Sequence, residues 1–130
     1  MTSISESHIA FFGSVTNIAK EKSQLIAALP SDGWAILNAD DKRTKRMGER
    51  TKARVLTYGF DNAAAVRADH LMLHRGDREV EGYSFKVNFE GKTVPIRLPH
   101  IVARHHIPAV LAAVAGGIAL RMNLVEIAGA

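Results

Sequence analysis

The chain has 130 residues, a length typical of one domain, and 47% of them are hydrophobic, so an ordinary globular core is expected. Its 17 Lys and Arg residues against 13 Asp and Glu residues give a net charge of +4, which suits an anionic ligand such as a nucleotide, while a nucleic acid is not the expected partner. The lack of cysteine excludes disulfides and thiolate chemistry. Residues 1–8 are too polar for a signal peptide, and no apolar run is long enough to span a bilayer; we therefore expect a cytoplasmic protein without a membrane partner.

The first half of the chain alternates between strand and helix patterns. Residues 2–5 resemble the end of a strand, and a helix is predicted from Ser14, its N-cap, to about Leu29. The apolar positions recur at helical spacing, and Lys22 falls on the same face. This predicted face consists of Val15, Ile18, Ala19, Leu25, Ile26 and Leu29.

Two further strands are predicted at residues 34–37 and 54–58, the second closed by Gly59. Between them, Asp40 or Asp41 is expected to cap a short polar helix that ends near Arg50. Together with the first segment, this succession predicts a βαβαβ core over residues 1–60 with right-handed crossovers.

The pattern then changes to the period of two that is typical of antiparallel strands. Residues 65–73, 83–89 and 94–98 predict a meander within residues 61–99 that could cap one end of the parallel sheet. Pro95 is expected on an edge strand or at a bulge. Residues 100–130 are predicted to be mainly helical, and Gly116-Gly117 suggests that another element approaches closely. We therefore predict a single α/β domain over 1–130: a parallel-sheet, three-layer core with a small antiparallel meander.

His8 and Lys22 allow two interpretations. The first is a loop histidine and a lysine whose ammonium extends past the apolar face to water. The second is a metal and phosphate site: a neutral imidazole can bind a divalent cation, whereas an ammonium cannot. A desolvated Lys22 could, however, react with CO₂ to form a carbamate, which provides oxygen ligands.

Other polar groups also allow a structural and a functional interpretation. Arg104, His105 and His106 form either an exposed cluster at a helix start or a contact for a nucleotide. Asn38 and the aspartates after it form either a turn with a helix cap or a contact for ribose or metal-bound water. The basic run is a solvated helix face or a polyanion contact; it comprises Lys42, Arg43, Lys45, Arg46, Arg50, Lys52 and Arg54.

Three segments, in matching order and spacing, resemble the central domain of the Mur ligases, the ATP-dependent amide-forming enzymes of peptidoglycan assembly. They are residues 5–22 with His8, Phe12-Gly13-Ser14, Asn17-Ile18-Ala19 and Lys22; residues 28–41, which end in Asn38-Ala39-Asp40-Asp41; and residues 104–115, which begin Arg104-His105-His106. Within the family, ligases that add meso-diaminopimelate or D-alanyl-D-alanine look most similar.

The resemblance implies that His8 is a magnesium ligand, that Lys22 is a carbamate supporting the same metal, and that the 104–106 segment faces the adenine of ATP. It also implies a UDP-muramoyl-peptide and an amino acid as substrates, joined after ATP activates a carboxylate as an acyl phosphate. Asn38 is expected to contribute to the nucleotide site.

The chain also departs from the family pattern. The family usually has asparagine at the positions of His106 and Ala109, and the phosphate-binding loop and the amino-acid-binding domain are not in this sequence. We therefore expect part of a ligase that is inactive alone. The alternative is a non-catalytic binding or assembly module, which could self-associate through an exposed sheet edge.

Overall fold

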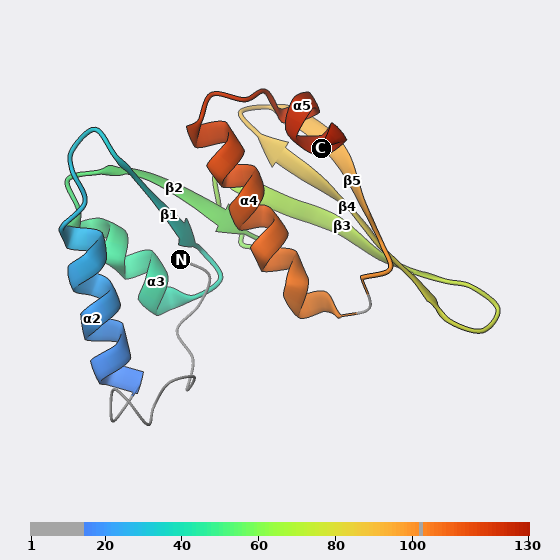
Figure 1. Cartoon of the computed structure of the whole chain (residues 1–130), viewed down its shortest axis with the longest axis horizontal. Coiled ribbons are helices and arrows are strands. Elements are labelled where there is room, and N and C mark those ends of the chain that lie inside the picture. The colour runs from blue at the N-terminus through green and yellow to red at the C-terminus, as the bar shows by residue number, and fades with distance from the viewer. Residues whose placement is uncertain (1–14, 102) are drawn as a thin grey trace.

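The computed structural model describes residues 15–101 and 103–130, and Figure 1 shows their arrangement. In chain order the elements are α2 (Val15–Ala27), β1 (Trp34–Asn38), α3 (Lys42–Met47), the 3-10 turn η1 (Gly48–Arg50), β2 (Arg54–Gly59), β3 (Val66–Arg75), β4 (Val80–Phe89), β5 (Lys92–Pro99), the 3-10 turn η2 (Arg104–His106), α4 (Ile107–Ala119) and α5 (Leu124–Gly129). No helix in this part of the chain is long and apolar enough to cross a membrane.

The described strands form one mixed sheet in the order β1-β2-β3-β4-β5. β1 and β2 are parallel along their length, β2 and β3 are also parallel, and β3, β4 and β5 form an antiparallel meander. The meander, which the sequence suggested could cap one end of the parallel sheet, therefore continues that sheet through β3. Pro95 lies in β5 at the end of this order, where a residue without an N–H is tolerated, as predicted.

The link between β2 and β3 is unusually short for a parallel pair. Such a connection normally needs about a dozen residues or more, because the chain must return along the strand. Here β3 starts beside the end of β2, and only Tyr58 with Val66 and Gly59 with Arg67 are in register. Residues 60–65 are therefore enough, and this loop stays at the carboxyl edge of the parallel strands.

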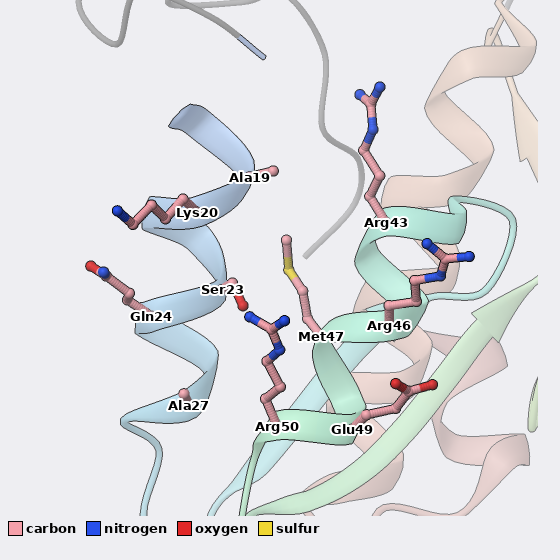
Figure 2. Close-up of a pocket in the computed structure, with 10 residues that line it drawn as sticks. All are labelled: Ala19, Lys20, Ser23, Gln24, Ala27, Arg43, Arg46, Met47, Glu49 and Arg50. Atoms are coloured by element: carbon pink, nitrogen blue, oxygen red, sulfur yellow. The ribbon is translucent and has the colours of Figure 1, made fainter. Parts of the chain in front are cut away.

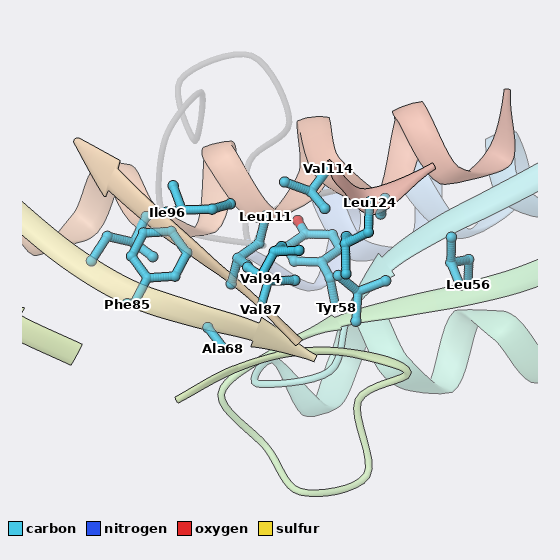
Figure 3. Packing of buried hydrophobic residues seen from close by; sticks show 13 residues of the cluster. Leu56, Tyr58, Ala68, Phe85, Val87, Val94, Ile96, Leu111, Val114 and Leu124 are labelled. Carbon is cyan, nitrogen blue, oxygen red and sulfur yellow. The ribbon is translucent and has the colours of Figure 1, made fainter. Parts of the chain in front are cut away.

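Helices cover both faces of the parallel strands, which confirms the predicted three-layer core (Figure 1). On one face, α4 and α5 pack over the sheet: Leu111 of α4 lies in one cluster with Tyr58 of β2 and Phe85 of β4, and each of the three is less than 2% exposed (Figure 3). Burying a large apolar side chain contributes about 1.5–3 kcal/mol. On the other face, α2 and α3 enclose a smaller cluster that includes Ile18, Ile26, Ala35, Leu37 and Met47.

Two details of α2 differ from the sequence prediction. The helix ends at Ala27, before the predicted end near Leu29. Leu25, assigned to the apolar face, is 67% exposed, while its neighbour Ile26 is buried. Successive helical residues point about 100° apart, so both cannot face the sheet squarely. Lys22 is half-buried and lies between Ile18 and Ile26 at i+4 spacing, on the packed face.

The C-terminal helices agree with the sequence. Asn123 and Glu126 form a capping box that starts α5. A Cβ atom placed on Gly117 would lie 2.8 Å from Cδ1 of Ile127, so the predicted close approach to this glycine is confirmed, and the approaching element is α5.

Candidate nucleotide site at the carboxyl edge of the sheet

The end of β1 is fixed by side chains of the Asn38–Asp41 turn. Oδ1 of Asn38 accepts a hydrogen bond from the Asp40 backbone N–H at 2.9 Å. The Asn38 side chain is buried, with only 6% of the residue exposed, so it holds the turn from inside. Oδ1 of Asp41 accepts from the N–H groups of Arg43 and Thr44 at 2.9 and 3.3 Å. Of the two aspartates predicted as caps, Asp41 is therefore the N-cap of α3.

Asp40 has a different role, because it joins the loops that follow β1 and β2. Its carboxylate accepts the backbone N–H of Phe60 at 3.0 Å and that of Asp61 at 2.7 Å. Gly59 has φ +150°, and a Cβ atom there would lie 2.7 Å from Oδ1 of Asp40. Glycine is thus required at position 59, because the Asp40 carboxylate packs directly against the backbone at the end of β2.

The negative charge of Asp40 also acts on the buried end of β2. Burial, and secondarily the nearby Asp40 carboxylate, raise the pKa of Tyr58 to about 12. Tyr58 is fully buried, so the phenol stays neutral at physiological pH.

The segment before α4 reaches the same edge through a contact between Arg104 and Phe60. The guanidinium carbon of Arg104 lies 5.2 Å from the centroid of the Phe60 ring, a cation–π arrangement. The rings of His105 and His106 are 4.3 Å apart at an interplanar angle of 39°. All three residues of η2 are exposed, so a cation and two aromatic faces are accessible to a ligand.

Phe60 was not among the site residues predicted from the sequence. Its signal was positional: it follows Gly59 directly at the carboxyl end of a parallel strand, where open α/β sheets bind their ligands. The structure thus joins the predicted 104–106 segment, through Phe60 and Asp40, to the predicted turn at Asn38.

The predicted metal site is only partly described. His8 lies outside the described residues, so its pairing with Lys22 stays a prediction. Within 15–101 and 103–130, no group of three or more His, Cys, Asp or Glu side chains could hold a metal ion. A magnesium site at Lys22 would therefore need oxygen atoms that an unmodified lysine does not have.

A mixed sheet covered by helices on both faces defines an α/β domain, and folds of this class usually place their ligands at the carboxyl edge of the parallel strands. Residues 1–117 match the model of the Mur ligase middle domain, and the chain belongs to that family. The resemblance seen in the sequence is thereby confirmed.

Two curated relatives illustrate the similarity. The UDP-N-acetylmuramoyl-L-alanyl-D-glutamate–2,6-diaminopimelate ligase of Chlamydia caviae is 33% identical over 115 residues, which are 88% of this chain and 23% of that protein. The UDP-N-acetylmuramate–L-alanine ligase of Aquifex aeolicus is 29% identical over 124 residues, covering 95% of this chain and 26% of that protein. The chain thus spans about a quarter of the length of these relatives.

Solved structures show the same fold. MurF from Acinetobacter baumannii superposes with a TM-score of 0.82 at 23% identity, over 98% of this chain and 27% of that one. MurF ligase from Thermotoga maritima in complex with ADP gives a TM-score of 0.76 at 12% identity, over 99% of this chain and 30% of that one.

Proposed function

We propose that this chain supplies part of the Mg–ATP site of an ATP-dependent ligase that joins an amino acid or dipeptide to a UDP-muramoyl-peptide in the cytoplasm. The observation that carries the proposal is the Asp40–Phe60–Arg104 arrangement at the carboxyl edge of a Mur ligase middle-domain fold. A relative of the same fold was solved with ADP, which supports a nucleotide as the ligand.

In this proposal the exposed groups of η2 bind the nucleoside part of ATP. His105 and His106 offer faces for stacking on adenine, and Arg104 offers a cation near the polar end of the ligand. Asp40 acts as a positioning residue, because its two backbone contacts fix the loop that carries Phe60 under Arg104. Asn38 contributes by holding the turn that places Asp40.

The reaction implied by the family is an acid–amine ligation. A substrate carboxylate attacks the γ-phosphorus of ATP, which gives an acyl phosphate and releases ADP. The amine of the incoming amino acid then attacks the acyl carbon, phosphate leaves, and the amine loses a proton as the amide forms. Cationic groups near the transferring phosphoryl group lower the energy of its developing charge.

His8 and a carbamylated Lys22 are the proposed supports of the magnesium ion, which would polarise phosphoryl oxygens when bound. The neutral Lys22 amine attacks CO₂, an N–C bond forms, and one proton leaves, so the product is an anion with two oxygen donors. The half-buried position of Lys22 on the packed face of α2, between Ile18 and Ile26, supports this assignment, because the side chain is not on the solvated face of the helix. Carbon-13 NMR with labelled bicarbonate should give a carbamate signal that is absent in Lys22→Ala; no difference between the two would count against this role.

The nucleotide proposal can be tested on the chain itself by titrating ATP into ¹⁵N-labelled protein. We expect millimolar binding, with amide shifts concentrated at residues 60–61 and 104–107, and several-fold weaker binding in Arg104→Ala. Arg97→Ala, which removes an exposed arginine from β5, is the matched control and should bind normally. The absence of shifts at residues 60–61 and 104–107 would instead favour the non-catalytic binding module.

Turnover by the chain alone is not expected, because it spans only about a quarter of the length of its ligase relatives. Phosphate release that depends on ATP, a UDP-muramoyl-peptide and an amino acid is the measurement that checks this. Activity above the protein-free rate would show that these 130 residues form a complete active site.

A further inference from the structure

A second site is formed on the opposite face of the sheet from α4. Helix α2 and the α3–η1 segment bound an open groove of about 690 Å³ (Figure 2). Basic residues dominate its polar lining, and one carboxylate is present. These charged groups are Lys20, Arg43, Arg46, Arg50 and Glu49.

The basic groups of the groove have no counter-ions among the described residues. The ion pairs of this part of the chain are those of Asp69 with Arg67 and His70, on β3. None of the four basic side chains has a hydrogen bond or an ion pair within residues 15–101 and 103–130. Four cations along one groove against a single carboxylate create a positive potential that attracts an anion.

Figure 2 shows how the side chains lie. Met47 and Arg50 project from α3 and η1 into the space facing α2, and the guanidinium of Arg50 points toward Ser23. Arg43 stands at one end of the same wall, while Lys20 lies on α2 and points outward. The groove therefore combines an apolar floor at Met47 with a central guanidinium from Arg50. Lys20 and Arg43 lie at its rim, and Arg46 lines it but points away from α2.

We propose that this groove binds a small anion carrying two or more phosphate groups, with Arg50 as the central contact. A guanidinium presents paired N–H donors that match two phosphate oxygens, and the Ser23 hydroxyl can add a third donor. The volume lies within the range of small-molecule sites. Because the cations are spread along the groove, a chain of phosphates uses them better than one isolated phosphate does.

The groove is separate from the proposed nucleotide site, because none of the residues that line it belongs to that site. It accounts for part of the basic run that the sequence left open between a solvated helix face and a polyanion contact. Arg54, the last member of that run, does not line the groove and instead lies 5.6 Å from the Trp34 ring centroid.

Inorganic tripolyphosphate, added to ¹⁵N-labelled protein in a phosphate-free buffer, is the probe that tests the groove. We expect saturable binding at one site, with amide shifts confined to α2, α3 and η1 and with an affinity that falls as salt rises. The double variant Arg46→Gln/Arg50→Gln should weaken binding at least tenfold. Because both arginines are exposed, it should keep the circular dichroism spectrum of the parent.

Two controls make the result specific. Lys92→Gln/Arg97→Gln removes the same charge from β5 and should leave the affinity within about twofold. Arg104→Ala should also retain binding, since it alters the proposed nucleotide site alone. If both double variants weaken tripolyphosphate binding equally, the anion is attracted by the overall positive charge and not by the groove, and the proposal is overturned. Absence of saturation, or loss of binding in Arg104→Ala, would overturn it as well.

Discussion

The carboxylate of Asp40 accepts the backbone N–H of Phe60, 20 residues further along the chain, and the ring of Phe60 lies under the guanidinium of Arg104. One side chain at the end of β1 therefore fixes the loop after β2, and that loop contacts the segment that opens α4. This relationship links three separate parts of the sequence at the edge where the nucleotide is proposed to bind.

Replacing Asp40 should loosen this edge. Asp40→Ala removes the acceptor of two backbone N–H groups, and we expect it to lower the free energy of unfolding by about 1–2 kcal/mol. Asp40→Asn keeps one oxygen and should cost less. Urea unfolding measures both. Asp32→Ala, in an exposed turn, is the control and should change stability by less than about 0.5 kcal/mol.

The neighbouring glycine offers an independent test of the same contact. Gly59→Ala places a Cβ atom against the Asp40 carboxylate at a strained φ and should cost about 1–3 kcal/mol. In the double variant Gly59→Ala/Asp40→Ala the clash is absent. Its loss of unfolding free energy should therefore be smaller than the sum of the losses in the two single variants. Strict additivity in urea unfolding would mean that the two residues do not interact.

Most of the fold could be predicted because hydrophobic periodicity differs between strand and helix. The alternation at residues 83–89 and 94–98 placed Phe85, Val87, Val94 and Ile96 on one face, and all four are buried under α4 and α5. Adjacent apolar residues gave no such guidance: Leu25 and Ile26 both fitted a 3–4 residue spacing, and only packing against the sheet selects Ile26.

The relation between the strands could not be predicted. The meander continues the parallel sheet because the start of β3 pairs with the end of β2. This pairing involves only two pairs of residues, and so short a contact leaves no recognisable pattern in the sequence. The candidate site was predicted in part. The 104–106 segment and the Asn38 turn were predicted from the sequence, and their role in nucleotide binding stays a prediction. The choice of Asp41 over Asp40 as the helix cap required the geometry. Phe60 was missed because a single aromatic residue after a glycine has no periodic signal.

Two adjacent glycines of α4 should respond in opposite directions to alanine. A Cβ atom on Gly117 would lie 2.8 Å from Cδ1 of Ile127, so Gly117→Ala should displace α5 and cost about 1–2 kcal/mol. Gly116 has no atom within 4 Å of the added Cβ, so Gly116→Ala should stabilise the helix by about 0.5–1 kcal/mol. Thermal unfolding compares the two; the same sign for both would show that α5 does not pack as described.

The raised pKa of Tyr58 predicts a loss of stability in alkaline solution. The pKa of Tyr58 is about 12 in the folded state, against 10.0 for an ordinary tyrosine. The contribution of the neutral phenol to stability is therefore fully present below pH 10. Between about pH 10 and 12 the unfolded state ionises first, and stability should fall by up to about 1.4 kcal/mol per pH unit. Tyr58→Phe should flatten this slope in urea unfolding, whereas the half-buried control Tyr83→Phe should leave the Tyr58 contribution in place.

Phe60 is predicted to act on nucleotide binding through Arg104. Phe60→Leu keeps an apolar side chain but removes the ring face that lies 5.2 Å from the guanidinium, which releases Arg104 to other rotamers. We expect ATP affinity to fall several-fold with little change in stability, and Phe60→Tyr, which retains the ring, to bind like the parent. NMR titration supplies the affinities and urea unfolding the stabilities. If Leu and Tyr at this position bind ATP equally well, the ring has no part in positioning Arg104, and the role of Phe60 reduces to its backbone bond with Asp40.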